Sequence, residues 1–266
     1  MKPPIKGLWG RGNWDLGKSE KIVAIMGSRK MSQYGKRVLA EIVPRFVEMG
    51  YVTVSGFMYG IDIEMHRLTV ENGGKTIGVF GWGIEAPIIP ENQSLHQRVL
   101  ESGGLFLSEI EPTRLGKLWT FPQRNRIVVG LSDMVIVVEA GMKSGSLNSA
   151  EWARKMDKPI YSVPGSIFST VSWGCNWLLA EGWAKPMTLD FFKNSFTPGV
   201  KGSHTPGVLN PRESNLVSLL TLEGPQSLNE LARRSGETAG EVAAMLTTLL
   251  LKGEVEEERG IWVVKR

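Results

Sequence analysis

The chain has one cysteine, Cys175, and three histidines among its 266 residues. A single thiol excludes a disulfide framework and a four-thiolate zinc site, and the three widely spaced histidines give no metal-ligand pattern. The chain also lacks the uninterrupted run of about 18 apolar residues that a membrane span requires. Residues 1–21 are broken by proline, glycine and charges, unlike a signal peptide. We therefore expect a protein of the reducing cytoplasm with no membrane partner.

Two nucleotide-binding signatures are missing as well. The first expected strand is followed by GSRKMSQYG, which departs from G-x-G-x-x-G, and no acidic residue ends the second strand to hold a ribose. The P-loop pattern G-x-x-x-x-G-K-[ST] is also missing. These absences disfavour a nicotinamide enzyme and a P-loop nucleoside triphosphatase, and we expect no cofactor.

The sequence does contain a regular alternation of short apolar runs and amphipathic stretches from residue 21 onwards. This alternation is typical of a parallel sheet with helices on both faces, so the predicted fold class is α/β, with a Rossmann-like sheet. We expect Pro44 to kink or split the first helix. The expected strands cover 21–27, 51–56, 75–81, 104–109, 133–140 and 159–165, and the expected helices cover 33–49, 62–72, 92–102, 123–131 and 145–156.

A second, smaller domain is predicted at the C-terminal end. Residues 193–212 are rich in Gly, Pro and Ser and have no periodicity, which is typical of a linker. Expected helices at 213–222, 228–234 and 237–252 and a hairpin turning near Gly260 then predict a winged helix-turn-helix. Ser227 and Glu230 have the spacing of a capping box. The predicted domains are 1–192 and 213–266, with the linker between them.

The charge is distributed unevenly between these parts. The formal net charge is +4; residues 210–266 hold seven basic and nine acidic residues, a net −2, which leaves +6 for residues 1–209. We therefore expect an anionic partner to meet the larger part. The third helix of the small domain begins acidic and carries only Lys252, so base-specific readout of duplex DNA is not expected. A protein-contact or regulatory role fits this domain better.

Small residues follow most of the expected strands, at 27–29, 55–62, 81–83, 139–146 and 163–166. In an open parallel sheet, ligands bind beyond the carboxyl ends of the strands. Small residues there let a ligand approach the backbone, and amides at helix N-termini attract anions. Arg29 can grip a phosphate bidentately, and Lys143 adds a point charge. The sequence therefore predicts a phosphate-binding edge.

Several motifs occur together in a fixed order: GSRKMSQYG, SGFMYGID-x-x-x-H, GKTIGVFGWGI, LSE, FPQRNRIVVGLSD, VVEAGMKSGSL and VPGS. Over roughly residues 8–192 the chain resembles the DprA/Smf DNA-processing proteins, and the winged helix fits the usual C-terminal module of that family. The resemblance implies a protein that binds single-stranded DNA, protects it during natural transformation and loads a RecA-type recombinase. It also implies a homodimer that is not an enzyme.

The resemblance also implies which residues meet the DNA. The main phosphate contacts would be Arg29, Lys143, Arg124 and Arg126. The choice between the last two stays open, because one could bind DNA while the other pairs with Glu109 or Glu139. The remaining members of the predicted site are Gly27, Ser28, Ser55, Gly56, Asn125, Ser144, Gly145 and Ser146.

The loop after Gly81 departs from the family pattern, and Trp82 in it could provide a stacking surface for a base. Among the nine tryptophans, the candidates for base stacking are Trp9, Trp14, Trp82 and Trp119.

Other functions remain open at this point. Glu151 stands where LOG-like phosphoribohydrolases have a catalytic glutamate, although the P-G-G-x-G-T core is missing. A nucleotide sensor or LOG-like nucleoside phosphoribohydrolase is therefore the alternative, and a transcription regulator acting through the winged helix is the third. Asp62 and His66 share a helix face, but no nucleophile accompanies them, so a structural role is favoured.

Overall fold

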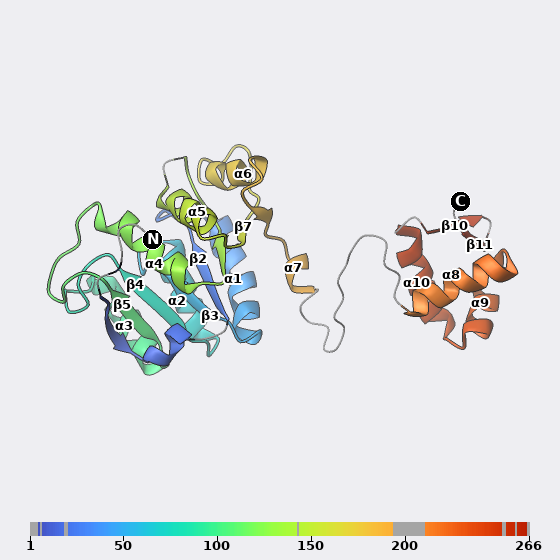
Figure 1. Ribbon diagram of the computed structural model, residues 1–266, viewed down its shortest axis with the longest axis horizontal. Helices are drawn as coiled ribbons and strands as arrows, with labels where there is room; N and C mark the ends of the chain where they lie inside the picture. The colour runs from blue at the N-terminus through green and yellow to red at the C-terminus, as the bar shows by residue number, and fades with distance from the viewer. Residues whose placement is uncertain are drawn as a thin grey trace. The chain divides into compact units, whose positions relative to one another are not determined.

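The computed structural model describes residues 5, 7–18, 21–142, 144–193, 211–251, 254–258 and 260–264. The chain divides into two compact units, Met1–Phe196 and Thr197–Arg266, which can be followed by colour in Figure 1. Each unit has its own hydrophobic core. The predicted linker lies largely outside the described residues, because residues 194–210 are not among them.

The larger unit is built on an eight-stranded sheet with the order β1-β5-β4-β3-β2-β6-β7-β8. All neighbours from β5 to β8 are parallel, and only the edge strand β1 is antiparallel. The α/β prediction is confirmed, and six of these strands lie where the apolar runs placed them. The strands are β1 (Trp9–Gly12), β2 (Ile22–Met26), β3 (Val52–Ser55), β4 (Thr76–Phe80), β5 (Leu105–Ser108), β6 (Met134–Val137), β7 (Ile160–Ser162) and β8 (Lys185–Pro186).

Helices cover both faces of this sheet (Figure 1). α1 (Gln33–Glu48), α2 (Ile61–Glu71) and α3 (Gln93–Glu101) pack on one face, and α4 (Thr120–Leu131), α5 (Gly145–Lys155) and α6 (Trp173–Ala180) pack on the other. Alternate residues of β2 serve the two sides: Ala24 packs in the core with α4 and α5, and Ile25 packs with α1 and α2. The shorter elements are η1 (Trp14–Lys18), η2 (Pro90–Asn92) and α7 (Asp190–Lys193).

Helix α1 contains Pro44 without being divided, so the expectation that Pro44 splits this helix was wrong. A proline removes one backbone hydrogen bond, but packing on both sides of it can hold the helix together. Leu39 lies before Pro44 and Phe46 after it, and both are fully buried against the sheet. At the start of the helix, the Ser32 hydroxyl accepts a hydrogen bond from the Gly35 amide at 3.1 Å.

The strand order places a topological switch point between β2 and β6. From β2 the chain moves outward through β3 and β4 to β5, and then returns to β6 on the other side of β2. Helix α1 therefore leaves β2 towards one face of the sheet, and α5 leaves β6 towards the opposite face. The loops at these two carboxyl ends diverge and leave a crevice, which is where open α/β sheets bind ligands.

The smaller unit has the three helices and the hairpin that the sequence predicted. Glu230 and Ser227 form the expected capping box, and Gly236 ends the second helix with a φ of 77°. Its strands pair in the order β10-β11-β9. The elements are α8 (Pro211–Glu223), β9 (Gln226–Ser227), α9 (Leu228–Ser235), α10 (Ala239–Leu251), β10 (Val255–Glu258) and β11 (Ile261–Val264). In the part of the chain that the structure describes, no helix has the length and apolarity to cross a membrane.

Candidate nucleic-acid interface

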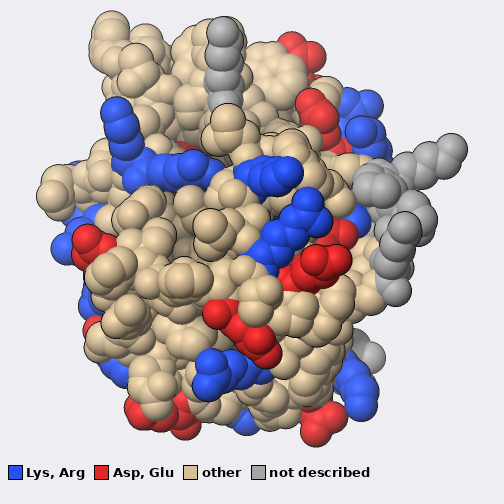
Figure 2. All heavy atoms as spheres, turned by 90° about the vertical axis from the view of Figure 1, so that its left-hand side faces the viewer, with Lys and Arg blue, Asp and Glu red and all other residues tan. Residues whose placement is uncertain are grey.

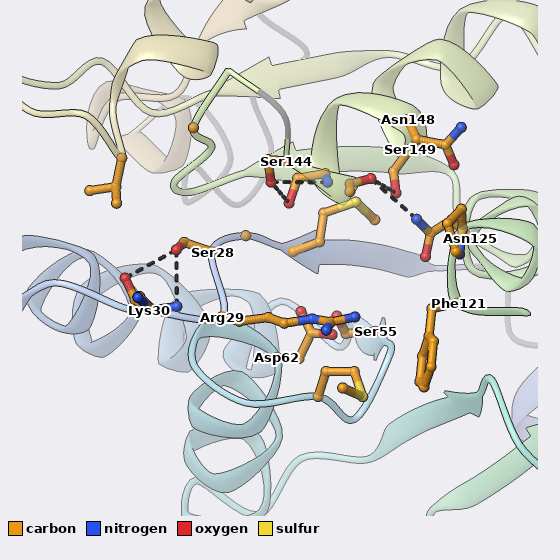
Figure 3. Close-up of a pocket in the computed structure, with 18 of the residues that line it drawn as sticks. Ser28, Arg29, Lys30, Ser55, Asp62, Phe121, Asn125, Ser144, Asn148 and Ser149 are labelled. Atoms are coloured by element: carbon orange, nitrogen blue, oxygen red, sulfur yellow. Dashed lines mark hydrogen bonds between the residues drawn. The ribbon is translucent and has the colours of Figure 1, made fainter. Parts of the chain in front are cut away.

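A cavity of about 990 Å³ opens at the switch point, and Figure 3 shows the side chains around it. Its walls come from the loop after β2, the end of β3, the first turn of α2, helix α4, the start of α5 and residues 170–173. Lys143 lies outside the described residues, but its neighbours Met142 and Ser144 both line the cavity. The cavity brings together nine predicted site residues, namely Gly27, Ser28, Arg29, Ser55, Arg124, Asn125, Ser144, Gly145 and Ser146.

Close backbone contacts fix the loop that carries Arg29. The Ile61 amide donates a hydrogen bond to the Ser28 carbonyl oxygen at 3.1 Å. Gly60 allows this contact, because it has a φ of 77° and a Cβ there would lie 2.3 Å from the same oxygen. The Arg29 side chain is exposed, and its Cζ lies 5.3 Å from the centre of the Phe121 ring (Figure 3). This cation–π contact holds the guanidinium beside α4 within the cavity.

Arg124 contributes positive charge from beneath the cavity. Its side chain is buried, and a Cβ on Gly56 would lie 2.0 Å from Nη1, so only glycine leaves room for this guanidinium. Burial lowers the pKa of Arg124 to about 10; the Asp62 charge opposes this shift and the Arg29 charge adds to it. Arg124 therefore stays cationic at neutral pH. Burial raises the pKa of the Asp62 carboxyl, and the charge of Arg124 opposes that shift.

The N-terminus of α5 forms the opposite wall. The Ser144 hydroxyl caps it by accepting a hydrogen bond from the Ser146 amide at 3.2 Å. Asn125 Nδ2 donates to the Gly145 carbonyl oxygen at 3.2 Å and thereby ties α4 to the start of α5. No acidic residue lies in the first turn of α5. The Ser146 amide is used by this cap, but no carboxylate of the chain neutralises the positive end of the helix dipole, which can attract an anion.

Arg126 does not belong to this cavity, and its prediction as a phosphate contact is wrong. Its side chain is fully buried, Nη1 donates to Glu109 Oε1 at 2.6 Å, and Nη2 lies 2.5 Å from Glu109 Oε2. Nη1 also donates to the Gln123 carbonyl oxygen at 2.8 Å. Of the two arginines left open by the sequence, Arg126 is therefore the one that fixes the fold.

Trp82 is also misplaced for the stacking role expected of it. Only 8% of it is exposed, and its ring stacks on Phe80 with the ring centres 4.6 Å apart. The loop folds inward because the Gly83 amide donates to the Arg114 carbonyl oxygen at 2.8 Å. The other three candidates are exposed, but the cavity wall includes none of them: Trp9, Trp14 and Trp119.

The structure supports a structural role for His66. Its Nδ1 lies 2.7 Å from the Thr76 hydroxyl, and no hydrogen bond joins it to Asp62, a residue that is also described. Burial, together with the smaller effect of the nearby Arg124 charge, lowers the pKa of His66 to about 3. The imidazole is therefore neutral at physiological pH. In the described ranges, no group of three or more His, Cys, Asp or Glu side chains could hold a metal ion.

The sequence did not reveal the wall formed by residues 170–173. Two backbone hydrogen bonds of 2.7 Å tie this segment and the residue after it to the loop that follows β6: Ala140 N donates to the Val171 carbonyl, and Gly174 N donates to the Ala140 carbonyl. These contacts join residues more than thirty positions apart, so no local pattern signals them. The lining residues that sequence reasoning missed include Leu118, Phe121, Met142, Asn148, Ser149, Thr170 and Trp173.

Two family models match the chain. Residues 1–193 match the family model of DNA recombination-mediator protein A, and residues 204–260 match that of the DprA winged helix domain. The chain belongs to the DprA/Smf family. The predicted resemblance is thereby confirmed, and the family is one of DNA-processing proteins.

Individual DprA proteins are similar over much of the chain. The DNA processing protein DprA of Streptococcus pneumoniae is 40% identical over 175 residues, which cover 66% of this chain and 61% of that protein. A DprA relative from Mycobacterium tuberculosis is 30% identical over 267 residues, covering 97% of this chain and 68% of the relative.

Two solved DprA structures share the fold. DNA processing protein A from Helicobacter pylori, whose structure concerns its single-stranded DNA binding mode, has a TM-score of 0.66 and 31% identity. The match covers 73% of this chain and 88% of that chain. DprA from Streptococcus pneumoniae has a TM-score of 0.64 and 38% identity, covering 72% of this chain and 66% of that one.

Proposed function

We propose that the cavity of the larger unit binds single-stranded DNA through its phosphates. The observation that carries this proposal is the convergence of Arg29, the buried cation of Arg124 and the N-terminus of α5 on one cavity at the switch point. The H. pylori relative with the same fold is described as binding single-stranded DNA, which supports it. In this arrangement Arg29 contacts a phosphate directly, and the N-terminus of α5 attracts it through the helix dipole.

The distribution of charge favours a chain of phosphates over a single nucleotide. Arg29 and Lys143 come from loops that follow different strands, and Figure 2 shows basic side chains in a band across the upper half of one face. Contacts to phosphates carry no sequence information, so we expect little base selectivity from them. The logarithm of the affinity should fall linearly with the logarithm of the salt concentration, with a slope of about −0.7 per phosphate neutralised.

The test is the double substitution Arg29→Ala and Lys143→Ala. We expect it to abolish most oligonucleotide binding and to reduce the salt slope by about 1.4, because two phosphate contacts are lost. Fluorescence anisotropy of a labelled oligonucleotide at several salt concentrations measures both quantities. Circular dichroism checks that the variant is folded. Unchanged affinity and slope in the folded variant would refute the site.

We also propose, from the family resemblance, that the protein is a homodimer without enzymatic activity. In this proposal it protects incoming single-stranded DNA in the cytoplasm during natural transformation and loads a RecA-type recombinase onto it. Sedimentation tests whether the protein is a dimer. Loading is tested by measuring how fast recombinase filaments form on single-stranded DNA in the presence and in the absence of this protein. A monomer at all concentrations, or no acceleration of filament formation, would contradict the respective part.

The two alternatives gain no support from the described residues. Glu151 is exposed on α5 and is not part of the cavity wall, so it is poorly placed to act on a nucleotide bound there. In the winged helix, Glu241 accepts hydrogen bonds from the Thr238 amide at 3.0 Å and the Thr238 hydroxyl at 2.7 Å. This carboxylate occupies the helix N-terminus that would otherwise attract a DNA phosphate.

A further inference from the structure

The rim of the cavity carries large apolar side chains that are open to solvent. Trp173 is 44% exposed, Met142 is 61% exposed and Leu118 is 92% exposed, and all three line the cavity that contains Arg29. Exposed aromatic and aliphatic groups of this size, gathered beside a binding site, commonly mark a contact surface. The cavity therefore combines a cationic interior with an apolar rim.

Backbone and side-chain hydrogen bonds hold two segments of this rim. Trp173 begins α6 and lies between Val171 and Gly174, whose backbones are both bonded to Ala140. Leu118 precedes α4, where the Thr120 hydroxyl donates to the Gly81 carbonyl oxygen at 2.6 Å and accepts from the Lys117 amide at 3.0 Å. Both apolar groups thus project from segments whose backbones are fixed before any ligand arrives.

An occupant of this cavity must be negatively charged and must also present an apolar surface. Inorganic phosphate offers only the charge, and an acidic peptide lacks flat apolar faces beside each charge. Single-stranded DNA has both features, because its charged backbone carries unpaired bases whose faces are apolar and able to stack. The apolar rim therefore suits the bases of single-stranded DNA, and the cationic interior suits its phosphates.

We propose that Trp173 stacks on a base of the strand whose phosphates occupy the cavity, with Leu118 contacting the strand at another point of the rim. This inference rests on the proposed function and deepens it, since it names the part of the DNA that the rim recognises. It also moves the expected stacking surface from Trp82, which is buried, to an exposed tryptophan that lines the cavity. Stacking of this kind accepts any base, because every base has a π face.

The experiment compares two ligands of equal charge. Affinities are measured for oligothymidylate and for an abasic deoxyribose-phosphate oligomer of the same length, using wild type, Trp173→Ala and Trp173→Phe. We expect Trp173→Ala to bind oligothymidylate about 5- to 10-fold more weakly, with the abasic ligand and the salt slope unchanged. Trp173→Phe should retain most of the affinity. Trp14→Ala is the matched control, because Trp14 is 49% exposed and does not line the cavity.

Each other outcome overturns the inference in a different way. Equal losses on the two ligands mean that Trp173 shapes the cavity without stacking, and no loss on either means that it makes no contact with DNA. If Trp173→Ala changes the sedimentation of the protein, and its effect on affinity is the same with and without bases, the rim binds a second copy of the chain. Arg29→Ala, measured in parallel, separates the two proposals. If Arg29→Ala weakens binding while Trp173→Ala does not, only stacking fails; if neither does, the proposed function fails.

Discussion

The two units treat the N-termini of their helices in opposite ways. In the larger unit, α5 begins at the cavity with a serine cap and no acidic residue in its first turn. In the smaller unit, Glu230 and Glu241 each bond back to the caps of their own helices. The backbone bond from Ser227 lowers the pKa of Glu230, and the Thr238 hydroxyl lowers that of Glu241. The larger unit leaves the positive end of the α5 dipole to a bound anion, whereas the smaller unit neutralises its helix N-termini with glutamates of its own.

A helix N-terminus therefore indicates an anion site only when the chain does not fill it. Even within the larger unit, the N-terminus of α1 is already occupied by a carboxylate of the chain. The Ser32 amide donates to the buried carboxylate of Glu139 at 3.0 Å, and the Ser32 hydroxyl bonds to it as well. The net charges of −2 and +6 for residues 210–266 and 1–209 follow the same division. Substitutions in each unit test whether anion binding follows this difference, and the largest effect is expected from a buried arginine.

The larger unit also contains positive charge that serves only its fold. We expect Arg126→Met to reduce the free energy of unfolding by about 3–5 kcal/mol, because it leaves the Glu109 carboxylate without its buried partner. Urea unfolding followed by tryptophan fluorescence measures this, since eight of the nine tryptophans precede residue 197. Arg29→Met is the control and should leave stability nearly unchanged. Similar stabilities for the two variants would contradict the different roles given to these arginines.

The stability of the larger unit should depend on pH through His66. Because the pKa of His66 is about 3 in the folded state and 6.5 for an unperturbed histidine, the unfolded chain binds a proton that the folded chain excludes. The contribution of His66 is complete above pH 6.5 and is lost as the pH falls towards 3. Between pH 8 and pH 5 we expect a loss of about 2 kcal/mol from the larger unit.

Urea unfolding of wild type and of His66→Gln at several pH values isolates this effect. The substitution should remove most of the loss between pH 8 and pH 5, even if it lowers stability at every pH; a smaller loss should remain, because burial also lowers the pKa of His96. Residues 211–266 contain no histidine, so the smaller unit should not show the transition. An equal pH dependence in wild type and variant would mean that His66 does not carry it.

Most of the architecture could be predicted from the sequence because its signals are local. The apolar runs of the buried parallel strands, the capping box at Ser227 and the turn at Gly260 depend on neighbouring residues, and the structure reproduces them. The cavity was predictable to the extent that small residues follow the strands. Its cationic loop at Arg29 lies where that pattern placed it.

The sequence-based predictions were wrong where contacts between residues far apart in the chain decide whether a side chain is buried. The motif FPQRNR contains two arginines, and only the position of Glu109 after β5 shows that Arg126 is buried and Arg124 faces the cavity. Trp82 looked available because the sequence does not show that residues 111–114 cover its loop. Trp173 was overlooked because its place at the rim depends on contacts with Ala140.

A smaller effect is expected in the winged helix. Ser227→Ala removes the hydroxyl that caps α9 and should reduce the stability of the smaller unit by about 1 kcal/mol. Hydrogen exchange of the α9 amides measures this loss, and affinity for single-stranded DNA should not change. A weaker DNA affinity in this variant would show that the smaller unit takes part in binding.

The smallest effect is expected from Arg233→Ala combined with Arg234→Ala. This variant loses the same two charges as Arg29→Ala with Lys143→Ala, so the two variants have equal net charge and differ only in where it is removed. Arg234 pairs with Glu223 at the surface, where both side chains are more than a third exposed, and such pairs contribute little to stability. We expect unchanged affinity and an unchanged salt slope. If DNA were attracted only by the overall charge of the chain, both variants would weaken binding equally. A loss confined to Arg29 and Lys143 would instead require phosphates to sit at the cavity, because contact and counterion release are local to the phosphates that are neutralised.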